Sequence, residues 1–278
     1  MVRNSRQLVV GAYKNKKAIG AFNAHNLEIF EAIITAARAK KSPVIIQITP
    51  KTAKHLPLRY FKKMAEAAEK IYPEVDFALH LDHGDSLEIV SEALELGFSS
   101  VMFDGSHLPF EKNVKLTRQV KKIASRFRVA VEAELGEMPK TGERLKKSTF
   151  LDVELIKKFL KSTKVDFLAV PLGTKHGMPS PGGEEHINFD YLKEIGPELH
   201  IPLVLHGASG VAKRELKKAR RYGVAKVNFD TALRRIFTYV LRKYLGSHPE
   251  EEDLRRYLKE ARIATKKLVE DKIEVLFG

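Results

Sequence analysis

The chain has 278 residues, of which 44% are hydrophobic; this is enough for a large core, and α/β barrels commonly occupy this length as one domain. No run approaches the roughly 18 apolar residues of a membrane span, and the first residues lead into no apolar signal segment. We therefore expect a cytoplasmic protein without membrane contacts. The absence of cysteine excludes disulfides, thiolate nucleophiles and cysteine-ligated zinc.

The net charge of +14 would be compatible with nucleic acid as a binding partner. The basic residues, however, form short clusters on the polar faces of predicted helices, as at Lys121-Lys122 and from Lys217 to Arg221, and aromatic residues do not interleave with them. This pattern is typical of solvated helical surfaces. We expect small-molecule partners and no nucleic acid.

Strand and helix patterns alternate along the chain. The predicted strands are 17–24, 44–49, 75–82, 99–103, 129–135, 165–172, 203–206 and 225–229. The predicted helices are 27–41, 58–72, 87–96, 110–127, 153–162, 189–199, 213–222 and 232–245, with one or two more between 253 and 277. Eight strand–helix pairs predict a (β/α)8 TIM barrel of the α/β class. We expect a single domain over 1–278, with the barrel at about 17–245 and a C-terminal helical extension at about 246–278.

Three histidines stand just past predicted strands, where a TIM barrel collects its chemistry. They are His83, His176 and His206. A catalytic zinc takes three protein ligands and keeps one position open, so together these histidines predict a metal site. Any one of these histidines, taken alone, could instead be a surface residue or a helix cap.

Acidic residues end neighbouring strands. Asp82 precedes His83, and a carboxylate beside a metal can shuttle a proton on a bound substrate. An aspartate that orients a ligand or caps the next helix would give the same pattern. Asp104 and Glu134 end the next two strands, and for them metal binding competes with helix capping or an ion pair.

Glycine-rich turns follow the last three predicted strands, at Gly177, 207–210 and 228–231. Barrels most often hold phosphate after strands seven and eight, on backbone N–H groups and hydroxyls. The sequence therefore predicts a phosphate site there, although one such turn by itself is only a turn.

Five motifs resemble class II, metal-dependent fructose-bisphosphate aldolases and their tagatose-bisphosphate relatives. They are LHLDHG at 79–84, VEAELG at 131–136, GTKHG at 173–177, LVLHGAS at 203–209 and KVNFDT at 226–231. The resemblance runs in order from about Gly20 to Phe237. It implies a lyase of glycolysis and gluconeogenesis that reversibly cleaves fructose 1,6-bisphosphate to dihydroxyacetone phosphate and glyceraldehyde 3-phosphate.

The resemblance also implies a zinc centre. His83, His176 and His206 would bind Zn²⁺, with Glu134 as an alternate ligand and Asp104 near a second metal position. The Zn²⁺ would act as a Lewis acid where negative charge develops, so that no Schiff-base lysine is required.

Two proton-transfer groups follow from the same resemblance. Asp82 would take the proton from the C4 hydroxyl in cleavage. Glu143 would exchange a proton on the enediolate carbon, but its loop, 138–151, is shorter than usual in the family and rich in lysine, so Glu137 remains its rival.

The resemblance implies contacts with substrate as well. Asp230 stands where fructose-specific members tend to carry an aspartate, whereas the short connection between strands seven and eight is more like the tagatose branch. Arg234 resembles the arginine that meets the distal phosphate, and backbone carbonyls near Gly177 and Gly207 would hold Na⁺ or K⁺. The expected substrate-binding residues are Asn23, Thr49, Gly177, Gly207, Ala208, Ser209, Asn228, Phe229, Asp230, Thr231 and Arg234.

Two other functions stay open at this point. A lysine-based aldolase would form a Schiff base on Lys226 or Lys175. A catalytically silent basic barrel would bind a sugar phosphate or nucleic acid. The resemblance and the tail after Asp253 also lead us to expect a homodimer or homotetramer.

Overall fold

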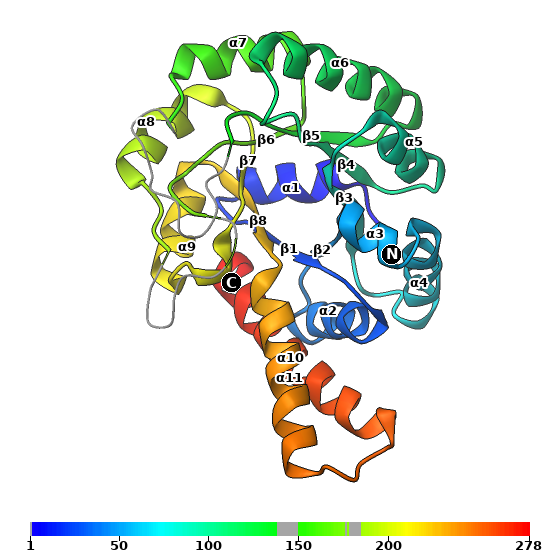
Figure 1. Ribbon diagram of the computed structural model, residues 1–278. Helices are drawn as coiled ribbons and strands as arrows, with labels where there is room; N and C mark the ends of the chain where they lie inside the picture. Colours follow the sequence, from blue (N-terminus) through cyan, green and yellow to red (C-terminus); the bar gives the residue numbers. More distant parts are fainter. Residues whose placement is uncertain (1, 138–149, 176, 178–184) are drawn as a thin grey trace.

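Eight parallel strands close into a barrel that helices surround, so the prediction of a TIM barrel is confirmed (Figure 1). The computed structural model describes residues 2–137, 150–175, 177 and 185–278. Each strand pairs with the next along the chain, and β1 pairs with β8. The strands are β1 (Ile19–Asn23), β2 (Val44–Ile48), β3 (Phe77–Gly84), β4 (Ser100–Phe103), β5 (Ala130–Glu134), β6 (Phe167–Ala169), β7 (Leu203–Leu205) and β8 (Val224–Phe229).

The helices begin at side chains that accept hydrogen bonds from exposed backbone N–H groups. Asn26, Ser86 and Asn188 each cap a following helix in this way. The α-helices are α1 (Ser5–Lys14), α2 (Leu27–Lys40), α3 (Pro50–His55), α4 (Leu58–Ile71), α5 (Leu87–Glu95), α6 (Phe110–Phe127), α7 (Val153–Thr163), α8 (Phe189–Leu199), α9 (Lys213–Ala219), α10 (Thr231–Ser247) and α11 (Leu254–Phe277). The described residues also form the short 3₁₀ helices η2 (Ala208–Gly210) and η3 (Arg220–Tyr222). Among the described helices, none is long and apolar enough to cross a bilayer.

The barrel interior changes from apolar to polar along the strands. Its lower layer joins Val9 and Ala12 of α1 to small and aliphatic strand residues such as Ala78 and Ala130, so α1 plugs this end (Figure 1). Side chains alternate between the two faces of a strand. The polar side chains that follow Ala78 and Ala130 at intervals of two therefore also face inward, toward the opposite mouth.

All eight strands differ from the predicted bounds by at least one residue at one end or both, and two of these differences have a clear physical cause. The predicted strand 165–172 is only Phe167–Ala169, because Pro171 has no N–H to donate to a ladder and the chain leaves the sheet before it. The third strand runs two residues further than expected, to Gly84, through a register shift against β4 between Leu81 and Gly84.

The C-terminal segment forms the single helix α11. With α10 it makes a helical hairpin that extends beyond the barrel and then returns along α2 (Figure 1). Leu276 is fully buried, and its carbonyl accepts a hydrogen bond from Ala18 N at 3.0 Å. The end of the chain therefore packs on the barrel at the entry to β1.

We expect Gly196→Ala to destabilise the fold. A Cβ at Gly196 would lie 2.2 Å from the backbone oxygen of Tyr222, where α8 crosses η3. Overpacking against backbone costs about 1–3 kcal/mol, to be measured by urea denaturation. Gly11→Ala is the matched control, because a Cβ there meets nothing within 4 Å and alanine favours the helix. A Gly196→Ala protein as stable as the control would contradict the packing described.

Candidate active site and metal centre

A cavity of about 280 Å³ opens at the carboxyl ends of the strands. It is lined by Asn23, Thr49, Asp82, His83, Gly177, His206, Gly207, Ser209, Asn228, Asp230, Thr231 and Arg234. The sequence assigns a role to every one of these residues. The structure brings these twelve residues together in one cavity. The role of each residue in binding or catalysis stays a prediction.

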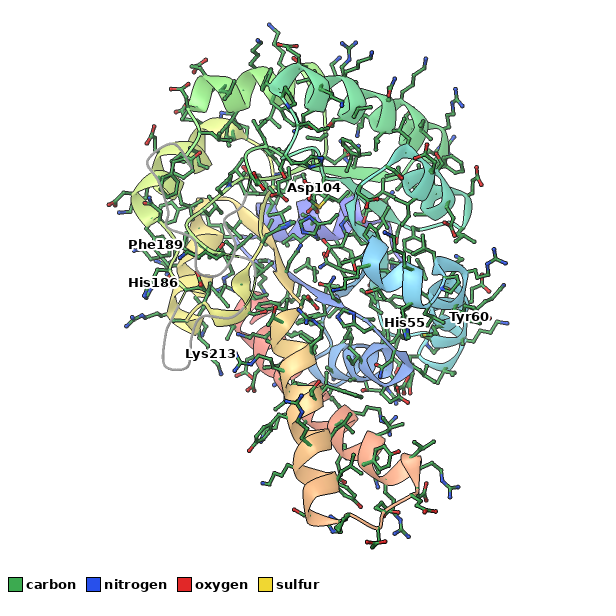
Figure 2. The ribbon with its side chains drawn as sticks, in the orientation of Figure 1. His55, Tyr60, Asp104, His186, Phe189 and Lys213 are labelled. Carbon is green, nitrogen blue, oxygen red and sulfur yellow. The ribbon has the colours of Figure 1, made fainter. Side chains whose placement is uncertain are left out.

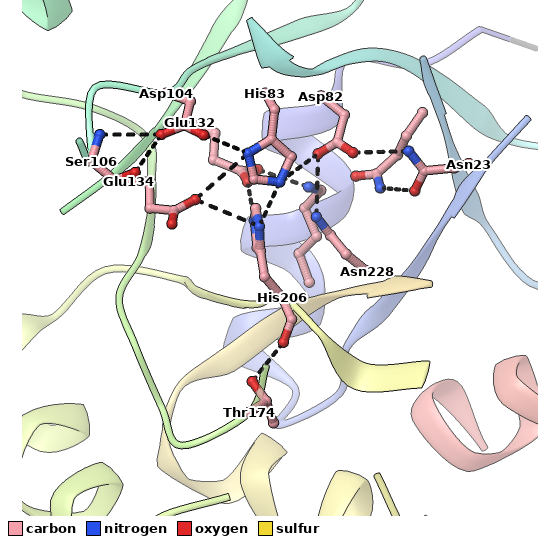
Figure 3. A network of polar contacts seen from close by, with 12 residues as sticks. Asn23, Asp82, His83, Asp104, Ser106, Glu132, Glu134, Thr174, His206 and Asn228 are labelled. Atoms are coloured by element: carbon pink, nitrogen blue, oxygen red, sulfur yellow. Dashed lines mark hydrogen bonds and ion pairs between the residues drawn. The ribbon is translucent and has the colours of Figure 1, made fainter. Parts of the chain in front are cut away.

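His83 reaches the cavity because β3 is irregular at its end. The residue has a φ of 51°, in the left-handed region that few non-glycine residues adopt, within the register shift between Leu81 and Gly84. Such irregularities turn a side chain away from the direction that a regular strand would give it. His83 Nε2 lies 3.1 Å from His206 Nδ1, although 123 residues separate them in sequence (Figure 3).

Carboxylates surround the two imidazoles. Asp104 Oδ2 lies 2.8 Å from His83 Nδ1, and Asp104 is held in turn by the backbone N–H and the hydroxyl of Ser106. Glu134 Oε2 lies 3.8 Å from His83 Nδ1 and 3.7 Å from His206 Nδ1. Asp104 lies inside the ring of helices, whereas His186 lies at its periphery and contacts Glu215 (Figure 2).

The electrostatics of this cluster favour a positive charge. Burial alone lowers the pKa of His83, but the acidic groups Asp82, Asp104 and Glu134 outweigh burial and raise the pKa to about 10. Burial raises the pKa of Glu134 to about 8. Glu134 Oε2 is buried, and no hydrogen-bond donor reaches it within the part of the chain that the structure describes. These groups would be satisfied by a cation placed between them.

The donor set fits a divalent metal. Potential ligand atoms of Asp82, His83 and His206 lie within 4.8 Å of one another, and so do those of His83, Asp104 and Glu134. Two nitrogens that bind one tetrahedral zinc at 2.0–2.1 Å lie about 3.3 Å apart. The observed 3.1 Å between His83 Nε2 and His206 Nδ1 is close to that value.

Two predicted residues, His176 and Glu143, lie outside the described residues. Gly177, next to His176, lines the cavity. Glu137, the rival of Glu143, is described and exposed, beyond a turn at Gly136.

Asp82 is oriented by a chain of amides. Asn23 Nδ2 donates to Asp82 Oδ2 at 2.9 Å, and Gln47 Nε2 donates to Asn23 Oδ1 at 2.9 Å (Figure 3). Asn228 Nδ2 donates to Asp82 Oδ1 at 3.4 Å. Asp82 Oδ1 lies 4.0 Å from His83 Nε2. Its carboxylate is therefore fixed beside the candidate metal ligands.

A buried charged layer lies beneath His206. From the sequence, Lys226 was a candidate Schiff-base lysine, whereas Glu132 had no predicted role. Glu132 Oε1 accepts from His206 Nε2 at 3.1 Å, which makes Nδ1, on the cavity side, the nitrogen with a lone pair. Glu132 Oε2 forms a 2.9 Å ion pair with Lys226 and lies 3.7 Å from His80 Nε2. The sequence does hold a signal for this role of Glu132: the alternation in VEAE at 131–134 places Glu132 on the same strand face as Glu134.

Gly207 turns the chain where two loops meet. Its φ is 66°, and a Cβ there would lie 2.3 Å from the Lys175 carbonyl oxygen. The Thr174 hydroxyl donates to the His206 carbonyl at 2.7 Å, which joins the loops after β6 and β7. Ser209 Oγ accepts from Ala232 N at 3.2 Å, beside the N-terminus of α10. Helix N-termini attract anions, so this side of the cavity fits a phosphate.

Asp230 and Arg234 form the neighbouring part of the rim, since Asp230 is the N-cap of α10 and Arg234 lies in its first turn. Arg234 donates twice to Asp230 Oδ2, at 2.9 and 3.2 Å, and His25 Nε2 lies 2.7 Å from Asp230 Oδ1. Burial raises the pKa of Asp230, but the His25 and Arg234 hydrogen bonds lower it to about 2. An outer hollow of about 550 Å³ shares this rim and adds Lys51, which the sequence analysis missed.

Ala208 and Phe229 lie outside the cavity lining. Phe229 is fully buried and stacks on Phe22 with ring centroids 5.4 Å apart. Ala208 is also fully buried, in η2. Both residues were expected to contact the substrate. Because their side chains are buried, only their backbone atoms could make such a contact.

The family model for "Fructose-bisphosphate aldolase class-II" matches residues 3–278. The chain belongs to this family. A fructose-bisphosphate aldolase of Giardia intestinalis is 38% identical, with 98% of this chain and 92% of the relative covered. A fructose-bisphosphate aldolase of Helicobacter pylori is 33% identical, with 99% and 98% covered.

A solved aldolase structure has the same fold. The YdjI aldolase of Escherichia coli K12 is 30% identical and covers 100% of this chain, with 98% of its own chain matched and a TM-score of 0.86. As a class II aldolase, the chain is a lyase of a zinc-dependent family, and its His/Asp/Glu cluster could hold the metal.

We expect Lys226 and Glu132 to be strongly coupled in stability. Lys226→Met alone should lower the free energy of unfolding by about 3–5 kcal/mol, because it leaves a buried carboxylate without its cation. In urea denaturation, adding Glu132→Gln to this variant should cost less than the sum of the two single changes.

Lys157 and Glu198 form a control pair with the same 2.9 Å separation on the surface. Lys157→Met should change stability little, because exposed pairs contribute little. Additive losses for the buried pair would contradict the coupling.

Proposed function

We propose that this class II aldolase reversibly cleaves fructose 1,6-bisphosphate, with Zn²⁺ as its cofactor. The observation that carries the proposal is the 3.1 Å approach of His83 Nε2 to His206 Nδ1, with Asp82 beside them in one cavity. The relatives at 33–38% identity are named fructose-bisphosphate aldolases, which supports this substrate.

His83 and His206 would hold the metal with His176, while Glu134 and Asp104 offer alternate ligand positions. The chemistry supplied by a bound Zn²⁺ is Lewis-acid stabilisation of the negative charge that develops next to the substrate carbonyl. Glu132 fixes the tautomer of His206 for this role.

Asp82 would act as the general base of cleavage. It accepts the proton of the C4 hydroxyl, the C4 oxygen forms the aldehyde of glyceraldehyde 3-phosphate, and the electron pair of the C3–C4 bond passes to C3. Protonation of C3 then gives dihydroxyacetone phosphate. In condensation, Asp82 returns its proton to the new hydroxyl. The hydrogen bonds from Asn23 and Asn228 hold this carboxylate in place.

The two phosphates would occupy different parts of the cavity and of the outer hollow that adjoins it. Ser209, Thr231 and the N-terminus of α10 would hold the dihydroxyacetone phosphate end, together with the turns at Gly177 and Gly207. Arg234 would meet the distal phosphate at the outer hollow, where Lys51 adds a second positive charge. A Na⁺ or K⁺ ion on the carbonyls near Gly177 and Gly207 and a homodimer or homotetramer stay predictions.

A lysine-based mechanism has little support in this geometry. Lys226 is 1% exposed and paired with Glu132, away from the cavity lining. Among the described residues, no lysine lines the cavity. Borohydride should therefore not trap the enzyme on its substrate.

The alternative substrate is tagatose 1,6-bisphosphate, which differs from the fructose isomer only at C4. Parallel steady-state assays of the zinc-loaded protein should give the higher kcat/KM with fructose 1,6-bisphosphate, because Asp230 and Arg234 match the fructose branch. EDTA should abolish cleavage, and added Zn²⁺ should restore it. A higher kcat/KM for the tagatose isomer would overturn the substrate assignment, and full activity in chelator would overturn the metal role.

Asp82→Asn should lower kcat by about 10²- to 10⁴-fold, because the amide cannot accept the C4 proton. KM and bound zinc should change little, since Asp82 is assigned to proton transfer. Asp85→Asn is the matched control; Asp85 lines only the outer hollow. Equal effects of the two substitutions in the aldol cleavage assay would rule out Asp82 as the base.

A further inference from the structure

Another hollow, of about 660 Å³, is lined by residues of α9 and η3. Helix α9 lies on the outside of the barrel (Figure 1). The hollow is lined entirely by basic residues, namely Lys16, Arg214, Lys217, Lys218, Arg220 and Arg221. It shares no lining residue with the cavity at the strand ends. The basic cluster from Lys217 to Arg221, interpreted from sequence as a solvated helical surface, is therefore part of a concave site.

The fold builds this hollow from segments far apart in sequence. Arg214, Lys217, Lys218 and Arg221 are spaced three, one and three residues apart, which places them on one helical face. Lys16 comes from the turn after α1, about 200 residues earlier. Arg220 is anchored, since its Nη1 donates to the Leu276 carbonyl at 2.7 Å.

The positive charge of the hollow is only partly balanced by neighbouring groups: Arg220 Nη1 also donates to the Gly278 oxygen at 3.3 Å, and Lys217, after the hydrogen bond from Lys40, contributes to a lowered pKa of Glu274. Within the part of the chain that the structure describes, no acidic residue lines it. The acids on neighbouring elements have other partners: Glu274 pairs with Lys40 at 2.8 Å, and Glu215 bonds His186 at 2.9 Å. Burial, and after it the charge of the neighbouring Arg221, lowers the pKa of Arg220, so these two guanidinium groups repel each other. An anion with several charges would relieve this repulsion.

We propose that this hollow binds a compact oligophosphate, a chain of two or more linked phosphates such as inorganic tripolyphosphate or the tail of a nucleoside triphosphate. Arginine forks and lysine ammonium groups are the side chains that bind phosphate oxygens most strongly. No aromatic side chain of the described residues lines the hollow to stack a base, and the Phe189 ring is covered by Lys218 Nζ at 4.0 Å from its centre. Recognition is therefore of the phosphates alone.

The test is calorimetric titration of the zinc-loaded protein with tripolyphosphate at low salt. The variant Arg214→Glu/Lys217→Glu/Arg221→Glu should weaken binding at least about tenfold, because it reverses three converging charges. The control Lys112→Glu/Lys115→Glu/Arg118→Glu makes the same change in net charge on α6 and should weaken binding less than about threefold. Zinc chelation and binding at the strand ends contribute equally to both variants.

Three further results would follow. ATP should bind within about threefold of tripolyphosphate, adenosine should not bind detectably, and about 200 mM salt should weaken binding strongly. Arg221→Gln, a milder change, should still weaken binding about two- to threefold if the triple variant fails to fold. Equal losses in the two triple variants would overturn the site. Tighter binding of a single-stranded oligonucleotide, lost in the same variant, would replace the oligophosphate with nucleic acid. Both of these outcomes are measured as binding, so they do not depend on whether the protein catalyses the aldolase reaction.

Discussion

Negative charge crowded around two touching imidazoles is the constraint on which the rest of this site depends. Asp82, Asp104 and Glu134 approach His83 or His206, and the raised pKa of His83 reports how strongly this cluster attracts a positive charge. Buried carboxylates are stable only when they are paired or bind metal. Of these three carboxylates, Glu134 is the one with a buried oxygen that no donor reaches among the described residues, and a divalent cation in the same place would satisfy it.

The layers beneath this cluster keep it in place. Glu132 links His206 to Lys226 in the middle of the barrel, and below that layer the interior becomes apolar where α1 closes it. In the proposed site, inward-facing residues two apart on one strand would thus perform different tasks: Glu132 would orient the proposed metal ligand His206, while Glu134 would face the metal position. The ladder of the closed barrel holds both at fixed depth, which gives the site its rigidity without disulfides.

The sequence predicted the fold and most of the cavity for a clear physical reason. Chemistry gathers at strand ends in a barrel, so residues such as Asn23, Asp82 and Asn228 could be placed at one mouth once the alternation of strands and helices was recognised.

Features set by tertiary contacts were harder to predict. The left-handed turn at His83 depends on a register shift between neighbouring strands, and Pro171 shortens β6 although its flanking residues are apolar. Glu132 was missed because a charged residue in mid-strand has no local signal for its partners. Phe229 sits inside a binding motif, but alternation turns its ring into the core against Phe22.

The most direct test of this account is diffraction at the zinc absorption edge from crystals of the zinc-loaded protein. We expect one strong anomalous peak within about 2.0–2.1 Å of both His83 Nε2 and His206 Nδ1, with His176 completing the ligand set. A peak elsewhere, or none between these two nitrogens at saturating zinc, would contradict this expectation.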